Sequence, residues 1–224
     1  MIRYTDIFND KTLNIFTDAS VLKLQNETIG SPGYVAVVGE NIVSERSEIL
    51  RYSTNNESEV YAILMAIQLA FYHKDNFKVI NIFSDSQFAV YGLREWIFKW
   101  INNIHDDRLY NSSGALVANQ KIFMNIIYII LNSNLKVSIY HNRGHFKNSQ
   151  VKEFIKLFTK HNFLNDYIDY QSAYKIMYYN DRVDNNTRSL LHNTKQFPPK
   201  LEIPDYLARN DLDMNYYKEL LNIK

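Results

Sequence analysis

Two segments of the chain repeat one short pattern, an apolar run that leads directly into an aspartate. They read NIFTDAS at 14–20 and NIFSDSQ at 81–87, and their aspartates are Asp18 and Asp85. If the two runs are neighbouring parallel strands, both carboxylates lie at the sheet edge where α/β proteins bind ligands. Carboxylates that close repel each other unless a proton or a cation compensates them, and hard divalent cations prefer oxygen ligands. The pattern therefore predicts a divalent metal site.

The alternative role for either aspartate is purely structural. Aspartate often caps the turn or helix that follows a strand, and taken alone either residue fits that role better. The matching position of Asp18 and Asp85 in their segments, together with a third acid, Glu59, near the start of a predicted helix, favours the metal site. Outside its sequence context, Glu59 would be interpreted as an exposed helix residue.

The rest of the chain supplies the strands and helices that must position these acids. Apolar alternation predicts strands, with turn-forming residues at 25–33 between the first two. Apolar residues at helical spacing predict helices, the first with Asn55 or Asn56 as its N-cap and the second with a break at Gly92. The predicted order is three strands (13–17, 34–38 and 43–50), a helix (56–72), a strand (79–84), two helices (87–100 and 116–131) and a strand (135–140). This alternation is typical of a mixed α/β sheet.

Further motifs accompany the two aspartate segments along the chain. They are TNNESE at 54–59, SDSQFAVYGLREWIFKW at 84–100, HNRGH at 141–145 and NDRVDNNTR at 180–188. In type and order these motifs resemble the type 1 ribonuclease H family over roughly residues 10–190. The resemblance implies an α/β, RNase H-like fold. Its mixed five-stranded sheet would have three antiparallel strands followed by parallel strands, flanked by helices.

The resemblance also implies an activity and a site. The chain would be an endonuclease that hydrolyses the RNA strand of an RNA/DNA hybrid. Four carboxylates, Asp18, Glu59, Asp85 and Asp184, would hold two Mg²⁺ ions, with Mn²⁺ as a substitute. His145, on a mobile loop, would carry protons during catalysis. The residues implied to contact the substrate are Ser20, Thr54, Asn55, Asn56 and Gln87.

The fourth carboxylate has two candidates. The family places it about ten residues after the Gly-His turn, where this chain offers Glu153, but the neighbours of Glu153 lack the family pattern. Asp184 has the family context without the spacing. Asn180 lies one helical turn before Asp184, so both side chains project from the same helix face. We therefore predict Asp184 as the fourth ligand.

The predicted domain, residues 1–193, carries an insertion at about 146–179, between the Gly-His turn and the last helix. An amphipathic helix in this insertion presents lysines every four residues on the side away from its apolar stripe: Lys152, Lys156 and Lys160. Such a stripe either binds phosphates or forms an ordinary solvated face, and both interpretations stay open. The tail, residues 194–224, is expected to form a short helix at 212–223 after its prolines.

Composition limits the function only weakly. The net charge of +1 argues against the broad basic surface of sequence-independent duplex binders, and the absence of cysteine excludes disulfides and thiolate metal sites. No apolar run reaches the roughly 18 residues of a membrane span, and the first residues lack the apolar core of a signal peptide. We therefore expect an intracellular, cytoplasmic protein without membrane contact. The abundance of Asn, Ile, Lys and Tyr indicates an AT-rich genome, viral, phage or bacterial.

Two other functions stay open at this point. A DNA junction or strand-transfer nuclease uses the same sheet and acidic cluster, but the TNN run, by its resemblance, favours a hybrid substrate. A non-catalytic nucleic-acid-binding module would be expected to have lost at least one of the four acids. This chain keeps all four.

Overall fold

The computed structural model describes residues 7–25, 27–106 and 108–194. The strands are β1 (Thr12–Lys23), β2 (Thr28–Val38), β3 (Asn41–Ser47), β4 (Leu50–Arg51), β5 (Val79–Ser84) and β8 (Lys136–His141), with β6 (Ile104–His105) and β7 (Arg108–Leu109) in a separate hairpin. The main sheet has the order β3-β2-β1-β5-β8, and the short β4 also pairs with β2. β1, β2 and β3 are antiparallel neighbours, whereas β5 and β8 run parallel to β1. The predicted fold class is confirmed.

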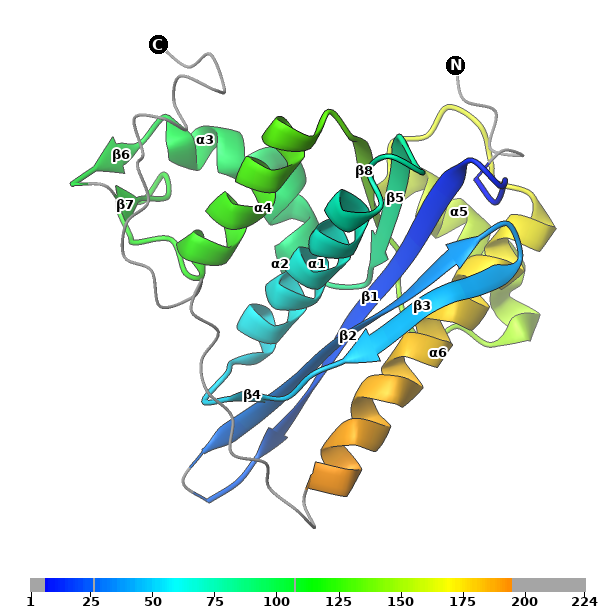
Figure 1. The fold of residues 1–224 in the computed structure, drawn as a ribbon, viewed down its shortest axis with the longest axis horizontal. Coiled ribbons are helices and arrows are strands. Elements are labelled where there is room, and N and C mark those ends of the chain that lie inside the picture. The colour runs from blue at the N-terminus through cyan, green and yellow to red at the C-terminus, as the bar shows by residue number, and fades with distance from the viewer. Residues whose placement is uncertain (1–6, 26, 107, 195–224) are drawn as a thin grey trace.

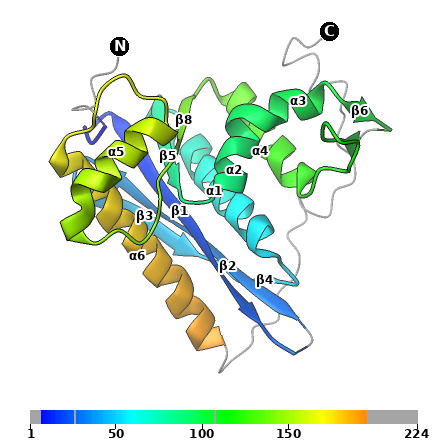
Figure 2. The same ribbon diagram turned by 180° about the vertical axis from the view of Figure 1, so that it is seen from behind.

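Helices cover both faces of the sheet (Figures 1 and 2). They are α1 (Asn55–Tyr72) and α4 (Gln120–Ser133) on one face and α5 (Val151–His161) and α6 (Tyr170–Thr194) on the other. Alternation along β1 explains the two cores, because successive side chains of a strand point to opposite faces. Leu13 and Ile15 pack under α1, and Phe16 packs under α6. The sheet is therefore buried on both faces.

The two repeated segments lie side by side in this sheet. Parallel pairing of β1 with β5 sets Asn14 opposite Asn81 and Phe16 opposite Phe83. Both asparagines are buried, and the Asn81 amide donates to Asn14 Oδ1 at 3.0 Å. The two phenylalanine rings stack with their centroids 4.6 Å apart. The repeat therefore has a structural reason, since like side chains match each other across the strand pair.

The first hairpin is longer than predicted, and the predicted turn at 25–33 is wrong. β2 already begins at Thr28, so its glycines lie inside a strand. A Cβ at Gly30 would overlap the Ser58 hydroxyl of α1, so glycine serves here for close packing of helix on strand. The strand predicted at 43–50 is divided into β3 and β4, which pair with opposite ends of β2.

The helix predicted at 87–100 changes its pitch rather than ending at the glycine. In order it consists of α2 (Gln87–Tyr91), a π-helical turn (Gly92–Trp96) and α3 (Ile97–Ile101). A Cβ at Gly92 would overlap the Phe123 ring of α4, so this glycine allows the two helices to approach closely. Trp100 packs edge-on against the same ring, with the centroids 5.3 Å apart. This tryptophan is a core residue.

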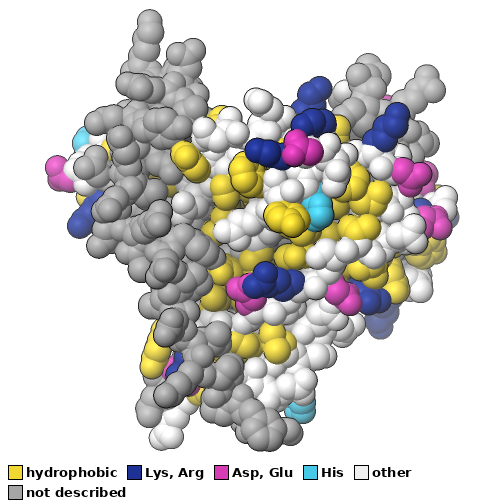
Figure 3. Space-filling view, in the orientation of Figure 1, with side chains coloured by type: hydrophobic (Ala, Val, Ile, Leu, Met, Phe, Trp, Pro, Cys, Tyr) yellow, Lys and Arg dark blue, Asp and Glu magenta, His cyan; other side chains and the backbone are white. Residues whose placement is uncertain are grey.

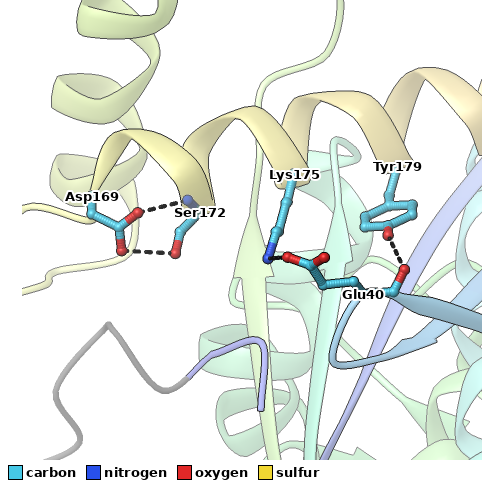
Figure 4. Close-up of polar contacts among 5 residues, drawn as sticks. All are labelled: Glu40, Asp169, Ser172, Lys175 and Tyr179. Atoms are coloured by element: carbon cyan, nitrogen blue, oxygen red, sulfur yellow. Dashed lines mark hydrogen bonds and ion pairs between the residues drawn. The ribbon is translucent and has the colours of Figure 1, made fainter. Parts of the chain in front are cut away.

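The last helix begins earlier than predicted, at Tyr170 instead of Asn180. Asp169 caps its first turn: the carboxylate accepts hydrogen bonds from the backbone N–H of Ser172 at 2.8 Å and from its hydroxyl at 2.9 Å (Figure 4). The segment between the Gly-His turn and the last helix is therefore 146–169 rather than 146–179, and it contains the predicted amphipathic helix as α5.

The early turns of α6 are fastened to the turn between β2 and β3. Lys175 Nζ lies 2.8 Å from the Glu40 carboxylate, and the Tyr179 hydroxyl donates to the Glu40 carbonyl at 3.2 Å (Figure 4). The ion pair is exposed and adds little stability, but the tyrosine ring also packs against the Phe16 ring in the core, with the centroids 5.2 Å apart. These contacts explain why the helix begins before the segment 180–188, from which it was predicted.

The surface carries no large field of one charge on the face drawn in Figure 3. Basic and acidic side chains lie among one another on the described part of that face, which agrees with the net charge of +1. Over the described ranges, none of the helices combines the length and the apolar character that crossing a membrane would need. The helix predicted at 212–223 and the prolines before it lie outside the described residues.

Candidate active site

Three acidic side chains meet at one edge of the sheet. Pairing between β1 and β5 ends at Thr17 and Ser84, so Asp18 and Asp85 directly follow the last paired residues of these adjacent strands. Glu59 joins them from α1, and one carboxylate oxygen from each of the three acids lies within 4.8 Å of the others. The predicted proximity of the two aspartates is confirmed. β1 itself continues past Asp18, however, and only its pairing with β5 ends there.

The start of α1 gives its two glutamates different roles. The Thr54 hydroxyl accepts from Glu57 N at 3.2 Å, and the Glu57 carboxylate accepts from Thr54 N at 3.4 Å, which closes a capping box. Glu59 is instead 7% exposed, and its Oε2 is buried without a hydrogen-bond partner among the described residues. A buried carboxylate oxygen without a donor is costly unless a proton or a cation satisfies it.

These acids line a cleft of about 470 Å³ between β1 and α6. Its walls come from the part of β1 beyond Asp18, from the C-terminal half of α6 and from the turn after β8. They contain Ala19, Ser20, Val21, Leu22, His145, Asp184, Arg188, Leu191 and His192. The cleft therefore combines an acidic floor with a wall that carries basic and imidazole groups.

The fourth acid of the cleft, Asp184, comes from α6. It is 9% exposed, and its Oδ1 lies 2.7 Å from Nε of Arg188, one helical turn later. Beside it the hydroxyls of Ser20 and Thr187 lie 2.9 Å apart and fasten α6 to β1. The competing candidate, Glu153, is exposed on α5 and does not line the cleft. The geometry thus brings Asp184, and not Glu153, to the other three acids.

Burial and mutual repulsion raise the pKa values of Asp18, Glu59 and Asp85. Burial is the main cause that raises the pKa of Asp18 to about 8, followed by the charges of Asp85 and Asp184. Burial and then the charge of Asp18 raise the pKa of Glu59 well above its ordinary value, and burial also raises the pKa of Asp85. Asp18, Glu59 and Asp85 therefore resist being ionised together unless a cation compensates their charges. Crowded oxygen donors with one unpartnered oxygen fit a hard divalent ion such as Mg²⁺.

The turn after β8 brings a histidine to the cleft. A Cβ at Gly144 would stand 2.5 Å from Asp85 Oδ2, so only glycine allows this close approach. His145 follows in the left-handed region, with φ of +62°, and lines the cleft. Its charge lowers the pKa of Asp85, against the larger upward effect of burial. The Asn142 amide donates to Asn180 Oδ1 at 2.6 Å and ties the turn to α6.

The elements that carry the four acids also carry a family signature. The sequence model of the RNase H family matches residues 10–188, from β1 to the turn of α6 that follows Asp184. The chain belongs to the RNase H family. The resemblance predicted from the motifs is confirmed, and the chain is a ribonuclease H, a hydrolase of phosphodiester bonds.

Known ribonucleases H align with most of this chain. Ribonuclease HI of Haemophilus ducreyi is 27% identical over 171 residues, which cover 73% of this chain and 99% of that protein. Ribonuclease H of Actinobacillus succinogenes is 31% identical over 156 residues, which cover 65% and 88%. The foamy viral protease-reverse transcriptase in complex with dsDNA superposes with a TM-score of 0.52 at 20% identity, covering 73% of this chain and 99% of that chain. Its complex with RNA/DNA hybrid gives 0.51 at 18% identity, covering 73% and 21%. These structures support the fold.

The residues that the RNase H resemblance implies for substrate contact are accessible or lie in the cleft. Ser20 lines the cleft itself. The others are exposed at helix starts, with Thr54, Asn55 and Asn56 at the start of α1 and Gln87 at the start of α2. Lys152, Lys156 and Lys160 are exposed on α5, and none of them lines the cleft. The substrate roles of all these residues stay predictions.

Sequence reasoning missed two basic side chains of this ribonuclease H cleft, Arg188 and His192. Arg188 lies within the segment NDRVDNNTR and four residues after Asp184, a spacing that brings helix side chains together. That spacing was a usable signal. His192 comes one helical turn later, in a segment without a motif, so only the structure brings it to the cleft.

Proposed function

We propose that this ribonuclease H is an endonuclease that hydrolyses the RNA strand of RNA/DNA hybrids, with two Mg²⁺ ions held by Asp18, Glu59, Asp85 and Asp184. The observation that carries the proposal is the convergence of four acids in one cleft, where burial and repulsion raise the pKa values of Asp18, Glu59 and Asp85. In nuclease sites with two metal ions, the bound cations compensate the charges of carboxylates that lie close together. The relatives named Ribonuclease H and the foamy viral complex with RNA/DNA hybrid support the hybrid as substrate.

Each acid would contribute from a different element. Bound ions would lower the pKa of the attacking water and stabilise the leaving 3′ oxygen. Asp18 and Asp85 have oxygens close enough to share an ion, and Glu59 adds its unpartnered Oε2. Asp184 adds a carboxylate from α6, which now pairs with an arginine. His145, on the turn beside Asp85, would accept or donate a proton at a ring nitrogen.

Recognition of RNA requires contact with the 2′-hydroxyl across a wide minor groove. We propose that Asn55, Asn56 and Gln87 reach this groove, since each is exposed at a helix start near a cleft acid. Thr54 would approach a phosphate of the DNA strand, and Ser20 would contact the RNA strand from inside the cleft.

The lysine stripe of α5 offers a further contact to the nucleic-acid backbone, and a solvated face is its alternative role. Replacing Lys152, Lys156 and Lys160 together by glutamine separates the two roles. A phosphate contact predicts weaker hybrid binding and a salt dependence whose slope falls by roughly 0.7 to 0.9 per lost contact. Unchanged affinity and slope would identify the stripe as a solvated face.

A panel of labelled duplexes tests the proposed function. RNA/DNA, RNA/RNA and DNA/DNA duplexes of one sequence are incubated with the full chain and Mg²⁺ or EDTA. We expect cleavage of the hybrid alone, only with Mg²⁺. Cleavage of the DNA duplex but not the hybrid would replace the proposal by a DNA junction or strand-transfer nuclease. Binding without cleavage of any duplex would indicate a non-catalytic module.

A further inference from the structure

A chain of imidazole rings links α5 to the backbone of Asp85. His141, the last residue of β8, is 2% exposed, and its Nε2 lies 3.1 Å from the carbonyl oxygen of Asp85. Its Nδ1 lies 3.0 Å from Nδ1 of His161, the last residue of α5. The two rings stack with their centroids 5.1 Å apart. A helix absent from the predicted family pattern is thus connected to a residue of the acidic cluster.

The residue after His161 completes this connection. Asn162, which is 6% exposed, accepts from His141 N at 2.8 Å through Oδ1 and donates to His141 O at 2.8 Å through Nδ2. Its side chain therefore satisfies both backbone groups of His141, as a neighbouring strand would, at the edge strand of the sheet. Arg94 donates to the same Oδ1 at 3.0 Å and holds the amide in place.

The direction of the hydrogen bonds follows from their partners. A carbonyl oxygen only accepts, so Nε2 of His141 carries the proton that it donates to Asp85. An imidazole ring that carries its N–H at Nε2 has an acceptor lone pair at Nδ1, so Nδ1 of His141 accepts. Nδ1 of His161 is then the donor. Every link runs the same way, from α5 through His141 to the Asp85 carbonyl.

The surroundings of Asp85 leave little room for movement. Gly144 approaches Asp85 Oδ2 so closely that a Cβ there would stand 2.5 Å away. A small shift of the Asp85 backbone would therefore press its carboxylate against the turn that carries His145. None of the residues His141, His161 and Asn162 lines the cleft, and His141 contacts the acidic cluster through the Asp85 carbonyl.

We propose that the end of α5 positions Asp85: His161 and Asn162 hold His141 against the Asp85 carbonyl, which fixes the Asp85 carboxylate for metal binding. This inference rests on the proposed metal role of Asp85. It gives the segment 146–169 a task at the site, although none of the residues of this segment lines the cleft. Mutating a residue that orients a metal ligand without touching the metal typically lowers metal affinity or activity by 10- to 100-fold.

Variants of His161 test the inference in the full chain. His161→Ala and His161→Leu remove the donor, whereas His161→Asn keeps an N–H near the position of Nδ1. Mn²⁺ binding without substrate is followed by the electron paramagnetic resonance signal of the free ion, and kcat and KM are measured on a hybrid. We expect about tenfold weaker Mn²⁺ binding and a lower kcat for the first two variants, with KM within about twofold of wild type. His161→Asn should recover Mn²⁺ binding to within about threefold.

Phe154→Leu is the matched control, because Phe154 is 1% exposed on the same helix and packs in the core without touching the imidazole chain. Melting temperatures are measured for all variants. Unchanged Mn²⁺ affinity in His161→Ala would overturn the positioning role of α5 and leave the proposed function standing. An equal loss of Mn²⁺ affinity in Phe154→Leu, at a similar melting temperature, would do the same. A wild-type protein that neither binds Mn²⁺ nor cleaves hybrids would instead reject the proposed function, and this inference with it.

Discussion

Replacing Asp18 with asparagine should stabilise the metal-free protein, and increasingly so as the pH rises. Burial, followed by the charges of Asp85 and Asp184, raises the pKa of Asp18 from 3.8 to about 8. A group whose pKa rises on folding favours the folded state while it is protonated, and that contribution is lost as pH rises through the folded pKa. Asparagine resembles the protonated acid and cannot ionise. The variant therefore keeps the stability that the wild-type protein loses.

The size of the effect follows from the pKa change. Between the unfolded pKa of 3.8 and the folded pKa of about 8, the free energy of unfolding of the wild-type protein falls by about 1.4 kcal/mol for each pH unit. The range from pH 5 to pH 8 covers about three such units. The free energy of unfolding of Asp18→Asn should therefore gain on that of wild type by up to about 4 kcal/mol over this range.

Urea unfolding in EDTA at pH 5 and pH 8, followed by circular dichroism, measures the difference. Asp166→Asn is the control, because Asp166 is exposed and lies outside the cleft, and it should show no such gain. Adding Mg²⁺ should stabilise the wild-type protein more than Asp18→Asn, since the ion needs the carboxylate. A stability difference that does not change with pH, or a variant less stable than wild type at pH 8, would refute the reasoning.

Five further variants extend the account. Asp85→Asn should reduce hybrid cleavage to background while circular dichroism shows an intact fold, and substantial turnover would contradict the metal assignment. Asp184→Asn should be nearly inactive with Mg²⁺ and Glu153→Gln close to wild type in the same assay, whereas the reverse ranking would move the fourth ligand to α5. His145→Ala should slow single-turnover cleavage by about 10² or less, because water can replace an acid–base group; complete loss would make His145 a ligand or a structural residue. Gly144→Ala should lower the melting temperature and the cleavage rate, since its Cβ would stand 2.5 Å from Asp85 Oδ2, and wild-type values for both would contradict that close approach.

The two aspartates could be predicted because they depend on local patterns. Each follows an apolar run of matching sequence, and parallel pairing brings the matching residues opposite each other. Glu59 and Asp184 depended on the resemblance instead. Helix periodicity alone gives no reason for a glutamate or an aspartate on a buried helix face, because that position is favourable only when a cation or another acid is nearby.

The lengths of several elements could not be predicted, because contacts distant in sequence determine them. Gly30 reads as a turn former, yet it lies within β2 and provides space for Ser58 of α1. α6 extends back to Tyr170 because its early turns pack on the turn between β2 and β3. One local signal was available: Asp169 with Ser172 three residues later is a capping pattern, and it does begin the helix.

The link between α5 and Asp85 had no signal in the sequence at all. It joins His141, His161 and Asn162 to a backbone carbonyl far away in the chain, and each residue taken alone suits a surface helix or a strand end. The motif HNRGH drew attention to its second histidine, which lines the cleft, whereas the first is buried behind Asp85. Only the packing of α5 on the sheet reveals the difference.

The strand that is cut, and its dependence on metal, test the central claim most directly. An RNA/DNA hybrid that carries one label on each strand is incubated with the wild-type chain and with Asp85→Asn over a range of Mg²⁺ concentrations. The account predicts internal cuts in the RNA strand alone, ending in 3′-hydroxyl and 5′-phosphate groups, at a rate that falls to zero in EDTA and in the variant. Cuts in the DNA strand, or RNA cleavage that persists in EDTA or in Asp85→Asn, would contradict it.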